Sequence, residues 1–287
     1  MTAVFKHEVS NYFHSLTAYI FGAFLLAFVG IGAMIYNIQQ AVANFEYVLS
    51  FVSLVFVVLV PVLTMRVIAE ERKQKTDQLL YSLPITTAQV VVGKYLALLV
   101  VFLVPLCVIG VYPLVFAQYG EVYLLTSYGS IAAFFIMGAA LIAVGTFISS
   151  LTENQGFAAG IAIPVILLNY YSVSLAEYVS ATALGSAVAL CVLCLLLGVV
   201  IRFLTKNENL AYAAAFVLMM AVGITYLTDS TVFEGLLSGI MTELSLFEWF
   251  YRFVNGVFDL TAIVYYLTVI VFFLFLSVQS LEKRRYD

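Results

Sequence analysis

Eight apolar runs, each about as long as a bilayer-crossing helix, dominate this chain. Such a helix needs about 20 predominantly apolar residues. Of the 287 residues, 64% are hydrophobic and 10% are charged, whereas a soluble domain carries about 25% charged residues. The composition therefore predicts an all-α, multi-pass membrane protein. The expected spans are residues 16–38, 48–69, 90–117, 127–150, 157–175, 181–204, 210–228 and 260–281.

Lys and Arg are distributed unevenly between the loops, and this asymmetry predicts the orientation. With the N-terminus in the cytoplasm, eleven of the twelve bases lie on the cytoplasmic side and only Arg252 lies outside. The sixteen acids divide evenly between the two sides, as expected for a rule that counts bases. We expect residues 1–287 to form a single domain of the cytoplasmic membrane, with both termini in the cytoplasm.

Residues 1–16 have the pattern of an amphipathic helix that lies in the cytoplasmic interface. The polar face includes His7 and His14, which we interpret as headgroup contacts in preference to metal ligands. One face carries Val4, Phe5, Val9, Phe13 and Leu16, and the other carries Lys6, His7, Ser10, Asn11 and His14.

The segment 66–89 is the main charged segment that we expect in the cytoplasm. Good helix formers without Gly or Pro predict a helix from Arg66 to Leu83, and Pro84 should end it. Thr86 lies three residues before Gln89, which is a capping-box pattern for the next helix. The segment also has an apolar corner from Leu79 to Ile85. Alternatively, the charges only set the topology and the leucines lie on the membrane.

Residues 229–259 form the longest outer segment. Two apolar helical stripes, divided at Glu243 and Ser245, predict two short helices in or dipping into the outer leaflet. Trp249 and Tyr251 suit that interface.

Catalytic and energy-coupling motifs are missing from the sequence. No ionisable residue lies near the middle of a span, whereas ion-coupled transporters usually keep such residues there. The sequence contains no phosphate-binding loop and no protease or hydrolase motif. Cys107, Cys191 and Cys194 lie inside apolar runs, where helix packing is the preferred interpretation over a metal or redox site. We expect a non-catalytic chain without metal or cofactor and without nucleic-acid partners.

Two pairs of small residues at four-residue spacing permit close helix approach. Ala23 and Ala27 lie in the first span, and Gly156 and Gly160 open the fifth. Either pair is a candidate for helix packing or for a dimer interface.

Taken together, these features resemble the permease subunit of a type-2 ATP-binding-cassette (ABC) transporter, especially its gliding-motility-associated branch. The likeness covers roughly residues 1–175 and 244–287. It rests on the amphipathic N-terminal helix, AEERKQKTDQLLYSLPIT at 69–86, SLTENQ at 150–155, and a C-terminal run with LFEWF at 246–250, GVFD at 256–259, YY at 265–266 and SLEKRR at 280–285.

The resemblance implies roles for these segments. Residues 66–89 would contain the coupling helix that docks on a separate ATPase subunit, 1–16 the connecting helix, and 229–259 a re-entrant hairpin. ATP and Mg would be bound by the ATPase, and a second permease, identical or paralogous, would complete the unit within membrane lipid, with an auxiliary membrane protein as a further partner. The usual core has six spans, so 181–228 would be an additional hairpin. The residues carried over to ATPase contact are Glu70, Glu71, Arg72, Asp77, Leu79, Leu80, Leu83 and Pro84.

Three functions are therefore compared. An ABC permease, with export as the expected direction, is the first hypothesis. A membrane anchor or scaffold that recruits a soluble partner is the alternative. An ion-coupled secondary transporter is less favoured, because no charge lies deep in a span.

The eight-span topology predicts opposite labelling of the two ends of helix 181–204. A membrane-impermeant thiol reagent applied to intact cells should label Ser180→Cys from outside and leave Asn207→Cys unlabelled. Labelling of both positions, or of neither, would contradict the additional transmembrane hairpin.

Overall fold

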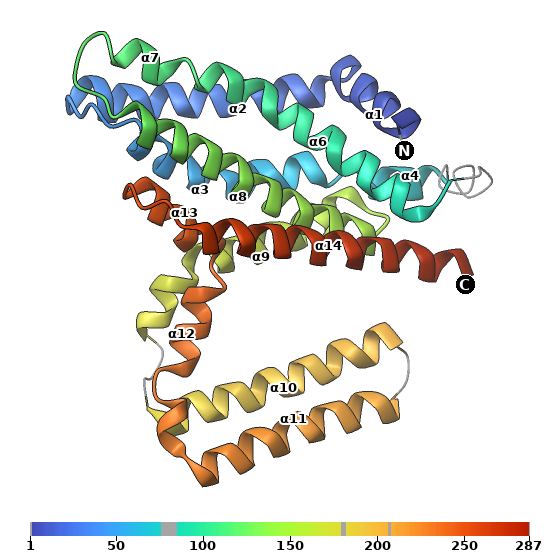
Figure 1. Cartoon of the computed structure of the whole chain (residues 1–287). Coiled ribbons are helices and arrows are strands. Elements are labelled where there is room, and N and C mark those ends of the chain that lie inside the picture. Colours follow the sequence, from blue (N-terminus) through green and yellow to red (C-terminus); the bar gives the residue numbers. More distant parts are fainter. Residues whose placement is uncertain (1, 76–84, 179–181, 206–207, 287) are drawn as a thin grey trace. The chain divides into compact units, whose positions relative to one another are not determined.

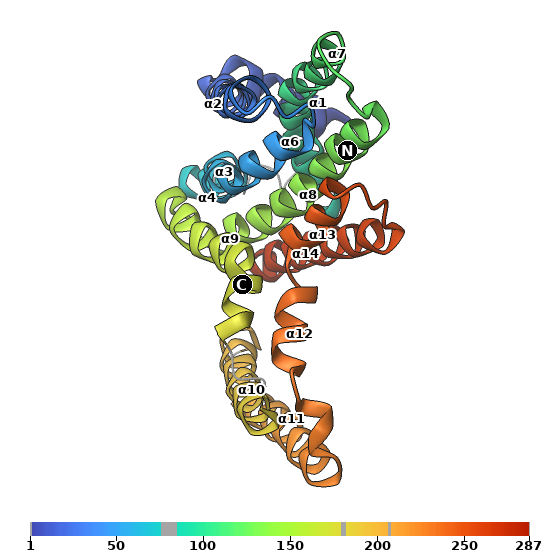
Figure 2. The ribbon, with the colours of Figure 1, turned by 90° about the vertical axis from the view of Figure 1, so that its left-hand side faces the viewer.

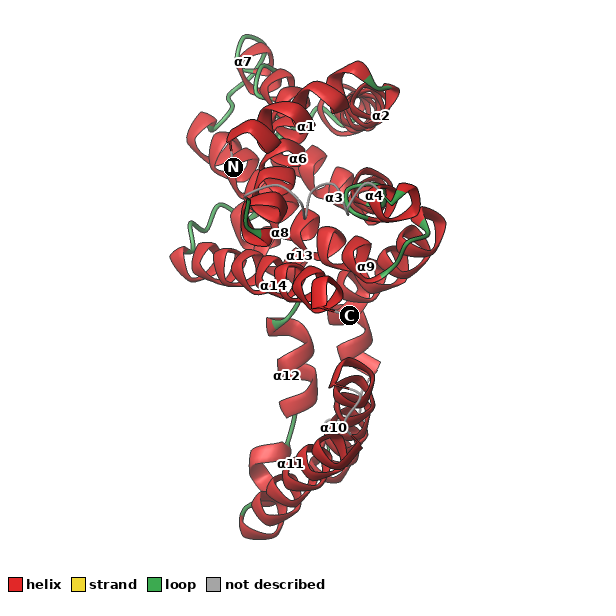
Figure 3. Ribbon diagram, turned by 90° about the vertical axis from the view of Figure 1, so that its right-hand side faces the viewer, coloured by secondary structure: helices red, strands yellow, loops and turns green. Residues whose placement is uncertain are grey.

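The computed structural model describes residues 2–75, 85–178, 182–205 and 208–286. Within these ranges every regular element is helical (Figure 3), which confirms the predicted all-α class. The chain forms two compact units, one of residues 1–170 with 249–287 and one of residues 171–248.

Six helices in the described ranges are long and apolar enough to cross a membrane, and they match six of the predicted spans. Their helical cores are α2 (Leu16–Ala33), α3 (Glu46–Thr64), α6 (Thr87–Ile109), α8 (Leu124–Leu151), α9 (Gln155–Tyr178) and α14 (Leu260–Tyr286). Figure 1 shows α2, α3, α6, α8 and α14 running side by side in the first unit.

Helix α8 is the centre of the first unit. It packs against α3, α6 and α14, and Figure 2 shows it lying among these helices. Of the residues in its most apolar stretch, 78% are buried. Phe134 on α8 stacks on Phe56 of α3 with ring centroids 4.5 Å apart, and Phe102 of α6 meets Phe56 edge-on at 5.4 Å. Gly138 makes room for this cluster, because a Cβ there would lie 2.7 Å from Cζ of Phe102.

The third predicted span, 90–117, is interrupted rather than continuous. Helix α6 ends at Ile109, and a short helix α7 (Tyr112–Phe116) follows. Pro113 near the start of α7 has no N–H to continue the helical ladder. At the break, the carbonyl of Gly110 accepts a hydrogen bond from the Tyr128 hydroxyl at 3.0 Å.

The predicted N-terminal helix is confirmed as α1 (Thr2–His14). It packs on α6 and ends at Ser15, whose hydroxyl donates to the Tyr12 carbonyl at 3.0 Å. Helix α2 starts at the next residue and continues into a π-helical turn, η1 (Met34–Gln39).

The second unit contains the predicted additional hairpin. Helices α10 (Ala183–Thr205) and α11 (Glu208–Thr228) pack against each other and run antiparallel (Figure 1). Their apolar described stretches are Ala183–Val199 and Tyr212–Thr228, both slightly short of the about 20 residues of a typical span. The crossing of the membrane by this hairpin stays a prediction.

Segment 229–259 has the predicted pair of short helices. After a 3-10 turn, η2 (Ser230–Phe233), come α12 (Leu236–Glu243) and α13 (Leu246–Val254). The break falls at the predicted place, where the hydroxyl of Ser245 accepts the N–H of Glu248 at 3.3 Å.

Trp249 on α13 is buried, although we expected it at the membrane interface. Its ring stacks on Tyr265 of α14 with centroids 5.6 Å apart. The Arg252 guanidinium lies 3.9 Å from the centre of the Trp249 ring and donates to Asp259 at 3.0 Å. This aromatic and ionic contact holds α13 to the start of α14.

Gly145→Ala should destabilise the contact between α3 and α8. The new Cβ would lie 2.8 Å from the Cβ of Thr64, and overpacking of this kind costs about 1–3 kcal/mol. Gly129→Ala on the same helix is the matched control, because a Cβ there meets nothing within 4 Å. The apparent melting temperature in detergent should fall for the first variant only. Equal melting temperatures would contradict the close approach.

Candidate functional site

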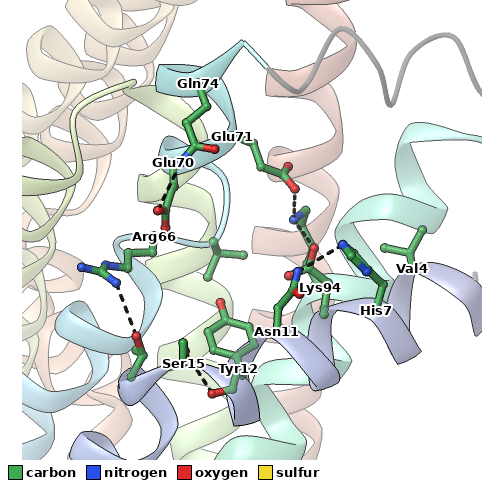
Figure 4. Close-up of a pocket in the computed structure, with 13 residues that line it drawn as sticks. Val4, His7, Asn11, Tyr12, Ser15, Arg66, Glu70, Glu71, Gln74 and Lys94 are labelled. Atoms are coloured by element: carbon green, nitrogen blue, oxygen red, sulfur yellow. Dashed lines mark hydrogen bonds and ion pairs between the residues drawn. The ribbon is translucent and has the colours of Figure 1, made fainter.

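Three elements meet at one end of the first unit and enclose a polar pocket of about 530 Å³ (Figure 4). They are α1, the beginning of α6, and the segment 65–75, which includes the short helix α4 (Ala69–Gln74). Charged side chains from all three line the pocket, namely Glu8, Arg66, Glu70, Glu71 and Lys94.

Lys94 joins the three elements. It is 2% exposed, and its Nζ donates to Oε1 of Glu8 at 2.7 Å and to Oε1 of Glu71 at 2.6 Å. Charge-assisted bonds of this length are the strong ones. A buried ammonium needs such partners, since leaving it unpaired costs several kcal/mol.

Gly93, beside Lys94, permits the close packing of α1 on α6. A Cβ at this position would lie 3.1 Å from the Val4 side chain. The small residue therefore brings Glu8 within reach of Lys94.

Ser149 on α8 holds the turn that leads into α4. Its hydroxyl accepts the N–H groups of Ile68 and Ala69, both at 3.2 Å, and donates to the Met65 carbonyl at 3.2 Å. The first N–H groups of a helix have no partner inside the helix, so this single buried hydroxyl fixes the place where α4 begins.

The predicted continuous helix from Arg66 to Leu83 is wrong. Residues 65–68 form a turn, α4 begins at Ala69, and it ends at Gln74, after which Lys75 has the left-handed conformation with φ 57°. The sequence propensity was overridden by the contact with Ser149, which stabilises the turn.

The predicted capping box is confirmed at the start of α6. The Thr86 hydroxyl accepts the N–H of Gln89 at 3.3 Å, and the Gln89 side chain accepts the N–H of Thr86 at 3.5 Å. This box fixes the first turn of the helix that carries Lys94.

Tyr12 lies on the wall of the pocket. Burial, together with the negative charges of Glu8 and Glu71, raises the pKa of its hydroxyl well above the ordinary value. The hydroxyl therefore stays neutral and adds no further negative charge to a pocket that already holds three carboxylates.

The residues predicted to contact an ATPase divide into two groups. Glu70 is half-buried and accepts a hydrogen bond from Gln74 at 3.4 Å, Glu71 is ion-paired with Lys94, and Arg72 is 4% exposed. The others, Asp77, Leu79, Leu80, Leu83 and Pro84, lie outside the described residues.

The small-residue pairs lie on open helix surfaces. Ala23, Ala27, Gly156 and Gly160 are all exposed, and a Cβ on Gly160 would meet nothing within 4 Å. They are available to another helix, and their place in a dimer interface stays a prediction.

Sequence reasoning missed the cluster of Glu8, Glu71 and Lys94, which we call the ionic junction. It also missed another buried acid, Glu46. Lys94 served only as a marker of orientation, although a lysine inside an apolar run has to find an acid, and Glu8 is the acid of segment 1–16. Glu46 is 1% exposed at the start of α3, where it accepts a hydrogen bond from Ser127 at 2.9 Å. Neither Ser127 nor Ser149 had a signal in the sequence.

Metal chemistry has no support in the part of the chain that the structure describes, where no group of three His, Cys, Asp or Glu side chains could hold an ion. Both histidines bond within α1. His7 pairs with Asn11 at 3.2 Å, and His14 contacts Ser10. The contacts of the site tie segment 65–75 to the ends of α6 and α8.

The sequence model of a protein family described as 'ABC-2 family transporter protein' matches residues 3–176, which is more than half of the chain. The chain belongs to the ABC-2 transporter family. It is thus a membrane-embedded permease subunit of an ABC transporter, a kind of subunit that normally works with a separate ABC ATPase. No curated protein and no solved structure matches the chain.

The match to the ABC-2 family includes the whole ionic junction, from α1 through α6, and α8 with Ser149. It ends within α9, before the hairpin of α10 and α11. The site described above therefore belongs to the shared permease core.

Lys94→Met should destabilise the permease by about 3 kcal/mol, because Glu8 and Glu71 would be left without their shared cation in a partly buried site. We place the value at the low end of the range for buried pairs, since the Glu71 side chain is 26% exposed. Thermal unfolding in detergent measures the loss. Lys73→Met, at an exposed position on α4, is the control and should be neutral. A neutral Lys94→Met would contradict the role of the junction.

Proposed function

We propose that this ABC-2 permease exports a substrate across the cytoplasmic membrane with ATP hydrolysed by a separate subunit that docks at residues 66–89. The ATPase subunit would hold ATP and Mg, and the permease would have no catalytic residue of its own. The distribution of bases supports this orientation, with both termini and segment 66–89 in the cytoplasm.

The observation that carries the proposal is the double ion pair of Lys94. Through Glu71 it ties α4 to α6, and through Glu8 it ties α1 to α6. A partner that displaces segment 66–89 would therefore move the ends of spans directly, as rigid-body switching requires. A mere anchor for a soluble protein has no need of this connection.

Ser149 adds a second path from the docking segment into the permease. Its hydroxyl bonds three backbone groups around residues 65–69. It lies on α8, whose apolar stretch is the most buried among the six long helices of the described ranges. Movement of α4 would reach the centre of the helix bundle without passing through a flexible side chain.

Within the docking segment, we assign the ATPase contact to Asp77, Leu79, Leu80, Leu83 and Pro84, whereas Glu70 lines the polar pocket. Glu71 and Arg72 would support the segment from inside, because Glu71 is ion-paired with Lys94 and Arg72 is buried. The leucines would supply the buried contact with the ATPase.

A working transporter would contain two permeases and two ATPases. The exposed small residues Ala23, Ala27, Gly156 and Gly160 are our candidates for the contact with a second permease. We place the permease in the gliding-motility-associated branch as a further proposal. It rests on the resemblance of the C-terminal run of residues 246–285 alone, which lies beyond the range that the family model matches.

Replacing Leu79, Leu80 and Leu83 together with Asp should abolish co-purification with the ATPase encoded beside this permease, because three buried apolar contacts would become charges. Lys73→Glu with Lys75→Glu is the control for charge change in the same segment and should retain most of the association. Pull-down and ATPase activity in proteoliposomes measure both.

Unchanged association of the triple Asp variant would contradict docking at this corner. Association without ATP-dependent transport would favour a scaffold, and transport by the permease alone under an ion gradient would favour a secondary transporter.

A further inference from the structure

An apolar groove of about 880 Å³ lies between α2 and α3. Its size is within the range of about 300–1,000 Å³ that is typical of small-molecule sites. The buried floor includes Phe21 and Leu63, and the exposed walls include Ile20, Phe24 and Val58. The groove is thus open from the side, where hydrocarbon would surround the spans.

The groove occupies one half of the helix pair. At the other half the two helices touch, since a Cβ on Gly32 would lie 3.0 Å from the Val48 side chain. Along α2 the lining residues run from Leu16 to Phe28, about 18 Å at 1.5 Å per residue. This length is close to one leaflet of a hydrocarbon core of about 30 Å.

The apolar groove lies next to the polar pocket described above. Ser15, Thr17 and Arg66 line both of them. Arg66 is exposed and donates to Thr17 at 3.5 Å, so its guanidinium stands where the apolar and polar spaces meet. A hydrocarbon tail and a charged head could therefore be held together.

The charges that line this pocket have both signs. Glu8 and Glu71 are paired with Lys94. The carboxylate of Glu70, which accepts a hydrogen bond from Gln74, and the guanidinium of Arg66, which donates to Thr17, line the same pocket (Figure 4). An arginine suits a phosphate, and a carboxylate suits an ammonium group. A headgroup with a second negative charge would be repelled by Glu70.

We propose that an aminophospholipid of the surrounding leaflet binds here, with its phosphate on Arg66, its ammonium group toward Glu70 and one acyl chain between α2 and α3. The site goes beyond the proposed transport function and does not depend on it. A second permease is the weaker occupant, because Ala23 and Ala27 do not line the groove.

Native mass spectrometry of the purified full chain tests the site, with an equimolar mixture of phosphatidylethanolamine and phosphatidylglycerol that carry identical acyl chains. We expect one retained phosphatidylethanolamine per chain. Arg66→Gln should lower its retention about five-fold, which corresponds to the ~1 kcal/mol of one base near a lipid headgroup. Glu70→Gln should remove the preference over phosphatidylglycerol.

Filling the groove with a larger side chain is a second, independent test of the site. Val58→Trp should reduce lipid retention, whereas Val104→Trp, at a similarly exposed position on α6 (49% against 51%), should not. Lys6→Gln is the control for loss of an exposed base. All variants should elute and melt as the parent chain does.

Retention that is unchanged in both Arg66→Gln and Val58→Trp would overturn the proposal, and so would a preference for phosphatidylglycerol. A lipid-free dimer that Val58→Trp dissociates would assign the groove to a second permease and overturn it as well. Loss of ATPase docking in the triple Asp variant would leave this outcome unaffected.

Discussion

The buried ammonium of Lys94 is the interaction on which the packing of α1, α4 and α6 at one end of this permease depends. Its two carboxylate partners come from α1 and α4, elements that would otherwise lie separately at the membrane surface. A charge with 2% exposure is tolerated only when it is paired. Docking α1 and α4 on α6 is therefore a requirement of burying Lys94 at this place.

The remainder of the first unit supports this junction through α8. Phenylalanines from three helices stack around it, and glycines on α8 let Phe102 and Thr64 approach. Ser149, on the same helix, bonds the turn before α4. The polar contacts gather at one end of apolar spans, as expected when a soluble partner supplies the energy and the spans only change their arrangement.

The sequence predicted elements better than it predicted their interruptions. Apolar runs located the six long helices, amphipathic spacing located α1, and the Thr86 capping box located the start of α6, because each signal is local. The helix expected from Arg66 to Leu83 failed, since the hydroxyl that stabilises the turn at 65–68 belongs to Ser149, about 80 residues away. Pro113 indicated the interruption after Ile109, but the long apolar run from 90 to 117 was interpreted as one continuous span.

Composition alone determined that this chain crosses a membrane many times, and the placement of bases alone predicted that its charged segment 66–89 faces the cytoplasm. Hydrophobicity and charge act residue by residue, so they can be read without a fold. Tertiary structure decided which charges meet. That Glu8, Glu71 and Lys94 form one cluster follows from how α1 and α4 pack on α6, and no local pattern contains this information.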